Sequence, residues 1–163
     1  MYTEDIMNKI LTVVVLAVVL AGCSSLDTSS FSSVTGKEWK LIEVRIDSPI
    51  RREILFDRSA LSKENAGTFF TLKFDNDHVS GVAAPNRYNG PYTLGEEEKS
   101  ITISTLRTTM MAATIDPTKY VFRLKEHDYY QYIHNVYKWD LVNGRLILHS
   151  RNEAGQEVHM LFS

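Results

Sequence analysis

The chain of 163 residues has little cysteine, little net charge and no apolar run long enough to cross a bilayer. Its one cysteine is Cys23, so no disulfide can form within it. The formal net charge is −2 at pH 7, which argues against a nucleic-acid partner because such a partner needs a basic face. The apolar run at 10–20 falls well short of the ~20 residues that a spanning helix requires.

Short catalytic signatures are also absent. The chain has no Gly-x-Ser-x-Gly, His-Glu-x-x-His or phosphate-binding loop. Its histidines are His78, His127, His134, His149 and His159. On one helix, His127 and His134 would lie about two turns apart, whereas zinc ligands on a helix lie three or four residues apart. We therefore expect no metal, no cofactor and no enzymatic activity, and a hydrolase built from dispersed residues is the least favoured alternative.

The residues that precede Cys23 have the organisation of a signal peptide. Lys9 comes before the apolar core, and the small residues Ala21 and Gly22 follow it. The tetrad LAGC at 20–23 resembles the lipobox of bacterial lipoproteins. This resemblance implies a signal peptide over 1–22 and acyl chains, such as palmitate, on Cys23. Each buried methylene contributes ~0.8 kcal/mol, so two or three acyl chains hold a domain firmly on a membrane. The alternative is a plain secretory signal or a short anchor with an incidental cysteine.

The remainder of the chain predicts a tether and one domain. Residues 23–35 are rich in Ser and Thr and predict a flexible tether. Residues 36–163 are enough for one domain with a single core. Ser24, and not Asp, follows Cys23. In a cell with two membranes, the general lipoprotein sorting pattern then implies the outer membrane, on its periplasmic side.

Alternation of apolar and polar residues dominates the domain and predicts strands. The expected strands lie at 37–46, 68–74, 78–83, 90–95, 100–106, 136–141, 145–150 and 157–162. Asn143-Gly144 predicts a type I′ turn, and Asn89-Gly90 is a second candidate for a tight turn. Residues 47–67 lack a clean period and predict a long excursion.

One segment has helical spacing. Asp116 is a plausible N-cap, Pro117 suits a first helical position, and the apolar pattern predicts a helix over 125–135. The preceding residues 119–124 suit a strand or a loop. Short strands with one helix predict a mainly β fold, either an antiparallel barrel or a strongly curved sheet, with the helix over an open end or gap.

Three segments in this order resemble the META domain, the fold of the HslJ-like heat-shock lipoproteins. They are GKEWKLIEV at 36–44, VSGVAAPNRYNGPYTLG at 79–95 and ISTLRTTMMA at 103–112. The resemblance covers nearly all of 36–163 and implies a lipocalin-like β-barrel with a helix. Many members carry cysteines where this chain has Pro85 and Ala113. The family is linked to heat shock, envelope stress and drug tolerance, with no accepted catalytic activity.

A polar and aromatic cluster is the candidate binding surface. Its residues are Asn86, Tyr88, Asn89, Tyr92, Tyr129 and Tyr130. Amides and phenol groups can position a ligand or a protein partner. The alternative is structural: the first cluster forms a turn in which Asn86 bonds nearby backbone, and the tyrosines after 125 cover the end of the barrel. The TTMMA stretch at 108–112 suits either a flexible apolar lining or local packing.

These observations predict a non-enzymatic, lipid-anchored envelope protein that acts in envelope maintenance or stress tolerance through protein interaction. Its expected partners are the membrane, through Cys23, and an envelope protein. The alternative is a carrier that holds an acyl chain or an apolar small molecule inside the barrel. The two hypotheses differ in what they require of the interior of the barrel. The interior leaves no room for a ligand if it is filled by Trp39, Phe70, Phe74, Ile101, Trp139 and Met160.

Overall fold

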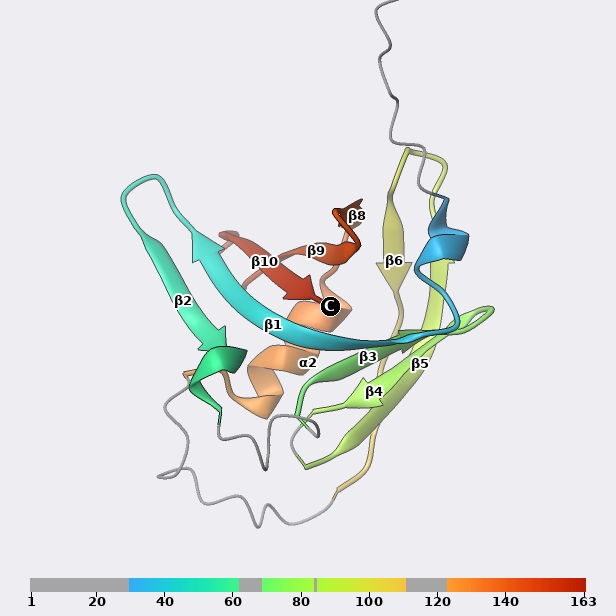
Figure 1. The fold of residues 1–163 in the computed structure, drawn as a ribbon, viewed down its shortest axis with the longest axis horizontal. Coiled ribbons are helices and arrows are strands. Elements are labelled where there is room, and N and C mark those ends of the chain that lie inside the picture. Colours follow the sequence, from blue (N-terminus) through green and yellow to red (C-terminus); the bar gives the residue numbers. More distant parts are fainter. Residues whose placement is uncertain (1–29, 62–68, 84, 111–122) are drawn as a thin grey trace, which may run out of the picture.

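The computed structural model describes residues 30–61, 69–83, 85–110 and 123–163 (Figure 1). Cys23, Asp116, Pro117 and the last two residues of the TTMMA stretch, Met111 and Ala112, lie outside these residues. The elements are η1 (Phe31–Ser33), β1 (Glu38–Asp47), β2 (Arg52–Asp57), η2 (Arg58–Ala60), β3 (Thr71–Phe74), β4 (His78–Val82), β5 (Arg87–Leu94), β6 (Ile101–Ile103), β7 (Arg107–Thr108), α2 (Glu126–His134), β8 (Lys138–Val142), β9 (Arg145–Arg151) and β10 (Glu157–Phe162). Among the described residues, no helix is both long and apolar enough to cross a membrane.

The strands form one antiparallel sheet in the order β6-β5-β4-β3-β1-β10-β9-β8, with β2 added to β1 and β7 to β5. Strand β1 is long and curved (Figure 1), and its pairing with β10 shifts register between Leu41 and Glu43. Its first residues pair with β3 and its later residues pair with β2. A bulge increases the local twist of a strand. Strand β1 can therefore bend the sheet around its hollow side.

The two ends of the sheet touch without closing it. An isolated bridge joins Ser100 to Lys138, and the Trp139 amide donates to the Lys99 carbonyl at 3.0 Å. The ladder does not continue, because β6 has only three residues and Lys99, just before it, has a φ of 61°. The closed lipocalin-like barrel is therefore wrong, and the strongly curved antiparallel sheet with one helix is confirmed.

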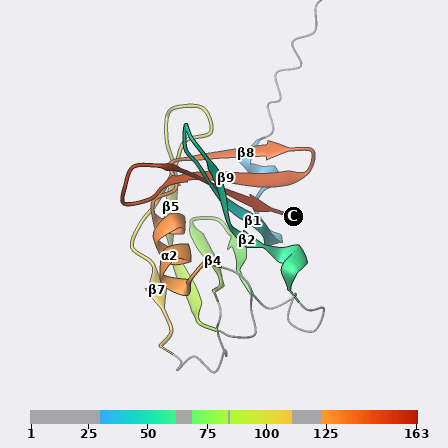
Figure 2. The same cartoon turned by 90° about the vertical axis from the view of Figure 1, so that its left-hand side faces the viewer.

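The helix α2 lies against the concave side of the sheet, in contact with β6 and β9 (Figure 2). The expected helix at 125–135 is confirmed, with each end one residue shorter. The Asp128 carboxylate accepts a hydrogen bond from the Lys125 amide at 3.3 Å, which satisfies a donor at the helix start. Its buried residues are Tyr129, Tyr132 and Ile133. The helix therefore presents one apolar stripe to the sheet.

The interior of the sheet is filled by side chains. Six residues are the ones whose burial would fill the interior and exclude a ligand. Each is at most 4% exposed: Trp39, Phe70, Phe74, Ile101, Trp139 and Met160. Phe31 and Val34 are buried with them, although the expected boundary between tether and domain lies at Gly36. The Trp39 indole N–H donates to the Val34 carbonyl at 2.8 Å. The packed part of the chain therefore begins earlier than its composition indicates.

Two turns test the local predictions. Asn143 and Gly144 join β8 to β9 with φ values of 51° and 73°, as a type I′ turn requires, so that prediction is confirmed. Asn89 and Gly90 lie inside β5 and pair with Ser80 and Val79 of β4, so the turn expected there is wrong. A Cβ on Gly90 would lie 2.9 Å from a methyl of Leu106, which explains the glycine by close packing.

The expected excursion at 47–67 contains a strand. Strand β2 pairs with β1 from Asp47↔Arg52 to Glu43↔Asp57. The sequence pattern misses β2 because the strand lies at an edge and only Phe56 is buried in it. A strand with one buried residue has no clear alternation of apolar and polar side chains.

Two histidines pair on the outer face of the sheet. The Nε2 atom of His159 lies 3.3 Å from the Asp47 carboxylate, and that of His149 lies 2.9 Å from the Asp140 carboxylate. Their rings meet edge to face at 5.0 Å. Burial lowers the pKa of His159, and nearby His149 and Arg45 lower it further, against the opposing carboxylates of Asp47 and Glu157.

This pKa shift predicts a stability that falls with acidity. The unfolded chain takes up a proton at an ordinary histidine pKa, whereas His159 in the folded protein takes it up only at lower pH. The free energy of unfolding should therefore fall as the pH drops below 6.5, towards the lower pKa of the folded state. Urea unfolding between about pH 8 and about pH 5 measures this slope. His159→Gln should flatten it, and an unchanged slope in this variant would contradict the assignment.

Candidate functional site

Two tyrosine hydroxyls of the expected binding surface meet inside the protein. Tyr88 of β5 and Tyr129 of α2 both donate to the carbonyl oxygen of Thr71, at 2.9 and 3.1 Å, and the two hydroxyls lie 3.1 Å apart. Both residues are at most 2% exposed. Burial raises the pKa of each. These phenols are therefore uncharged at neutral pH and join the helix to the sheet.

A glycine makes this junction sterically possible. A Cβ added to Gly81 would lie 2.0 Å from the Thr71 carbonyl oxygen and 2.7 Å from the Tyr88 hydroxyl. The amide of Val82, next in β4, donates to the Thr71 side-chain hydroxyl at 3.2 Å. Strand β4 therefore passes directly over the carbonyl on which both tyrosines converge.

A second network joins the start of α2 to the entry of β5. Asn86 donates to the Glu126 carboxylate from its backbone amide at 3.1 Å and from its side chain at 3.2 Å. The Tyr130 hydroxyl donates to the same carboxylate at 2.9 Å, and the Thr109 hydroxyl donates to the Asn86 side chain at 3.0 Å. Burial, and then the bond to Glu126, raise the pKa of Tyr130. Asn86 thus bonds a helix residue, where the structural alternative expected nearby backbone.

The structure brings together four of the six predicted site residues: Asn86, Tyr88, Tyr129 and Tyr130. Tyr92 is buried in a separate part of the core, where its hydroxyl donates to the Asp75 carbonyl at 2.8 Å and its ring packs on Phe31 and Phe74. Asn89 is exposed on the opposite face of β5. The set is therefore mainly internal scaffolding, with Asn89 and the half-buried Tyr130 at the surface.

A shallow groove exposes the edge of Tyr130. It lies between α2 and the segment around β7, has a volume of about 260 Å³, and is lined by Leu106, Thr108, His127 and His134 among others. The Nδ1 atom of His134 lies 3.4 Å from the Ser104 carbonyl oxygen. The groove is mostly apolar and small, so it offers little more than contact area for one or two side chains.

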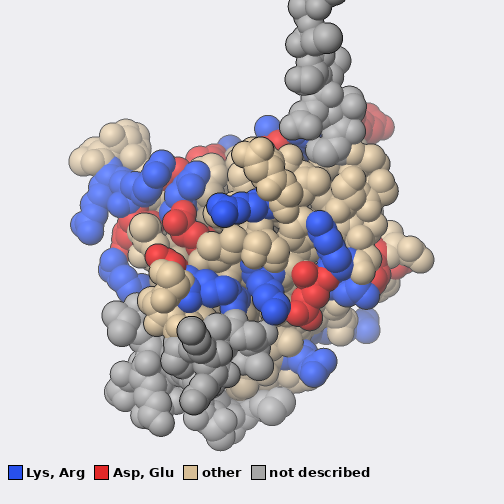
Figure 3. Space-filling model, viewed as in Figure 1, with Lys and Arg blue, Asp and Glu red and all other residues tan. Residues whose placement is uncertain are grey.

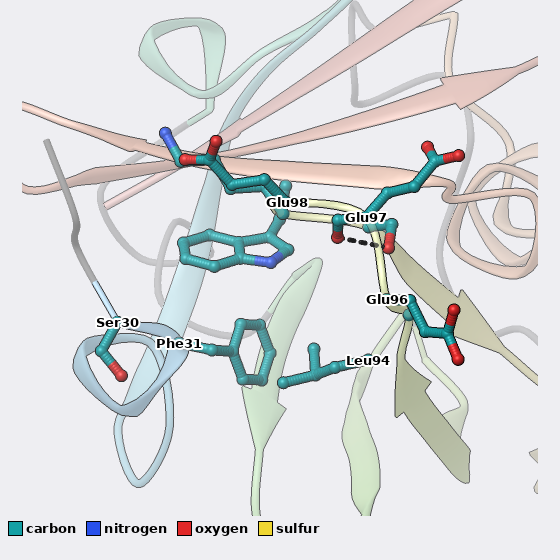
Figure 4. A pocket seen from close by; sticks show the side chains of 10 residues that line it. Ser30, Phe31, Leu94, Glu96, Glu97 and Glu98 are labelled. Carbon is teal, nitrogen blue, oxygen red and sulfur yellow. Dashed lines mark hydrogen bonds between the residues drawn. The ribbon is translucent and has the colours of Figure 1, made fainter. Parts of the chain in front are cut away.

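A larger hollow lies beside the first described residues of the chain. It has a volume of about 450 Å³. Phe31, Leu94 and Trp139 form its apolar lining, and the turn between β5 and β6 borders it with three successive glutamates (Figure 4). Leu94 is 49% exposed, so part of the lining faces solvent. The sequence predicts only an acidic turn here. Three adjacent glutamates close to Leu94 could have indicated a surface that combines apolar and acidic side chains.

The described residues hold no metal-binding cluster of three His, Cys, Asp or Glu side chains. No hydrogen bond between described residues joins a serine or threonine hydroxyl to a histidine ring; for example, Ser150 donates to the Tyr132 carbonyl at 2.7 Å.

Comparison with known proteins identifies two sequence features. The family model described as the META domain matches residues 32–161. The motif described as a prokaryotic membrane lipoprotein lipid attachment site matches residues 7–24, which include Cys23. No curated protein matches the chain.

Two solved structures share the fold. An NMR structure of a protein from Burkholderia xenovorans is 18% identical, with a TM-score of 0.52, and the match covers 81% of this chain and 85% of that one. A crystal structure of a DUF4847 family protein from Bacteroides vulgatus is 10% identical, with a TM-score of 0.51, and the match covers 82% of this chain and 95% of that one. At these identities the likeness concerns the fold alone.

The close packing at Thr71 predicts that alanine substitutions at two glycines lower the stability of the protein by unequal amounts. Gly81→Ala forces a methyl group against a backbone carbonyl and should lower the free energy of unfolding by about 3 kcal/mol or more. Gly90→Ala is the control in the next strand and should cost less, about 1 kcal/mol, because its new methyl group would lie 2.9 Å from a movable leucine methyl and 3.0 Å from the Thr105 carbonyl oxygen, not 2.0 Å from a carbonyl. Chemical denaturation measures both. Equal losses would show that Thr71 is not the tighter contact.

Proposed function

The chain belongs to the META domain family, and on that premise we propose that it is a non-enzymatic, lipid-anchored protein of the cell envelope that binds another protein in envelope maintenance or stress tolerance. The lipid attachment site supports the anchor. One structural observation carries the rest: the polar groups expected to bind a ligand are engaged in internal hydrogen bonds, while an open hollow with an acidic border faces solvent.

The filled interior weighs against the carrier alternative. Six large side chains occupy the space that an acyl chain would need, and none is more than 4% exposed. The helix α2 adds Tyr129 and Ile133 to the same core, both fully buried. A ligand inside the sheet would have to displace these residues, at a cost of several kcal/mol of lost packing.

The hollow beside Phe31 supports a protein partner of defined chemistry. Its lining is apolar, and Glu96, Glu97 and Glu98 stand at its border (Figure 4). A protein segment with an apolar side chain flanked by Lys or Arg is complementary to it in shape and in charge. Such apolar anchors within a charged surround are the usual source of affinity and of orientation in protein interfaces.

The anchor also supports a proposal for the place of the protein in the envelope. Ser24 after Cys23 supports the outer membrane, on the periplasmic side, if the cell has two membranes. The hollow is lined by Ser30, seven residues after Cys23 along the chain. At about 3.5 Å per residue, the partner contact would lie within about 25 Å of the lipid.

Photo-crosslinking at Leu94 tests the partner. A benzophenone amino acid at this position, in the full chain expressed in its own cells, should yield a discrete adduct with an envelope protein. The same amino acid at Val142, which is 45% exposed on β8, is the matched control and should yield no such adduct. Replacement of Glu96, Glu97 and Glu98 by Gln should weaken the Leu94 adduct several-fold. Equal adducts at both positions, or none, would contradict the proposal.

Substitution of the cysteine tests the anchor. Cys23→Ser should abolish the incorporation of labelled palmitate, because the thiol in the lipid attachment site is lost. The control is the double variant Cys23→Ser, Ser25→Cys, which keeps a thiol but moves it out of the lipid attachment site. Palmitate incorporation by either variant equal to that of the unchanged protein would contradict lipidation at Cys23.

A further inference from the structure

The hairpin that joins β1 to β2 ends in a rigid, exposed tip. The Ser48 amide donates to the Arg51 carbonyl at 3.1 Å. The Ser48 hydroxyl donates to the same carbonyl at 2.8 Å and accepts from the Arg51 amide at 3.1 Å. Pro49 further restricts the turn. The residues at its apex are therefore held in one position relative to the sheet.

The tip presents an apolar side chain next to two arginines. Ile50 is 97% exposed, and Ile54, further along β2, is 49% exposed. Arg51 and Arg52 are both exposed. Arg52 pairs with the Asp47 carboxylate at 3.1 Å, whereas the Arg51 guanidinium makes no hydrogen bond or ion pair with the described residues. An isoleucine that contacts nothing on a rigid turn contributes nothing to the core.

The tip and the first described residues both lie on the upper side of the molecule. In Figures 1 and 2 the β1–β2 turn and η1 are both near the top, but in Figure 1 they lie on opposite sides, left and right. Lys and Arg side chains gather over the upper left of Figure 3. Ser30 is seven residues after Cys23, which allows a reach of at most about 25 Å. An anchor at Cys23 thus keeps the upper side of the domain within reach of the bilayer.

We propose that residues 48–52 dock on the surface of an anionic phospholipid bilayer, with Ile50 in the interfacial region and the two arginines on lipid phosphates. The inference rests on the proposed lipid anchor and adds a second contact to it. Arginine binds phosphate in a bidentate manner, and an apolar side chain next to arginines suits the headgroup region. The tether makes the docking intramolecular, so a weak contact suffices.

The acidic turn between β5 and β6 influences how the domain is oriented on the bilayer. Glu96, Glu97 and Glu98 lie at the same upper end as the tip, on the opposite side in Figure 1. An anionic surface attracts the arginines of the tip and repels these glutamates. The domain would therefore tilt so that the hairpin contacts lipid and the hollow beside Phe31 stays open to a protein partner.

Spin labelling of the lipidated full chain tests the docking. In Ile50→Cys, lipidation of Cys23 leaves position 50 as the one free thiol, because the chain has no other cysteine. The matched control is Ala60→Cys, exposed in η2 at the far end of β2. Both are labelled with a nitroxide and reconstituted into vesicles of phosphatidylethanolamine and phosphatidylglycerol. Power saturation then compares collisions with oxygen, which enters bilayers, and with a water-soluble nickel chelate.

The label at position 50 should be shielded from nickel and accessible to oxygen, whereas the label at position 60 should remain in water. Arg51→Gln should lower the ratio of docked to undocked label about five-fold, as expected for one basic charge at an anionic surface. Equal accessibility at 50 and 60 would overturn the proposal and leave the tip to a protein partner. Equal shielding in phosphatidylcholine vesicles, or no effect of Arg51→Gln, would attribute the insertion to the label and also overturn it.

The same preparation separates this inference from the anchor. The chain with unsubstituted Ile50 should take up no label, because its cysteine is acylated. If it takes up label, Cys23 is free, and both the anchor and the docking that depends on it are overturned. If it takes up none while the label at 50 stays in water, the anchor stands and only the docking fails.

Discussion

The carbonyl oxygen of Thr71 is the point on which this fold depends. It accepts hydrogen bonds from a strand tyrosine and from a helix tyrosine, both fully buried. Phe70, just before it, has a φ of 50° and stacks its ring 4.9 Å from that of Tyr129. Arg58 donates to the neighbouring carbonyls of Leu41 and Phe69. These contacts hold α2 against the sheet and hold the sheet in its curve, which is not closed by a continuous ladder.

The sequence predicts most of this fold and less of the site. Period-two alternation and Asn143-Gly144 locate the last three strands, and helical spacing locates α2. Asn89-Gly90 misleads, because the dipeptide is typical of turns and here lies in a strand where Leu106 packs closely. Once β5 is a strand, its alternation places Tyr88 and Tyr92 inward and Asn89 outward. The convergence on Thr71 and Glu126 depends on tertiary packing, which no local pattern contains.

The groups to which we assign the proposed function lie at the surface. Among the described residues the core is filled by aromatic and aliphatic side chains, and its buried phenols are uncharged. Two outward features are the hollow with its acidic border and the hairpin tip with Arg51 and Arg52, which lie on the upper side of the molecule but at its right and left in Figure 1. A lipid-anchored domain with both features on this side would suit the proposed role at the membrane surface, with the tip on lipid and the hollow open to a partner.

Native mass spectrometry of the lipidated protein, extracted from its own envelope in mild detergent, tests the central claim that the interior holds no cargo. We expect one species, whose mass equals that of residues 23–163 plus covalent acyl groups on Cys23, unchanged by gentle activation. A second species that loses a small apolar molecule on activation would contradict the account and favour a carrier.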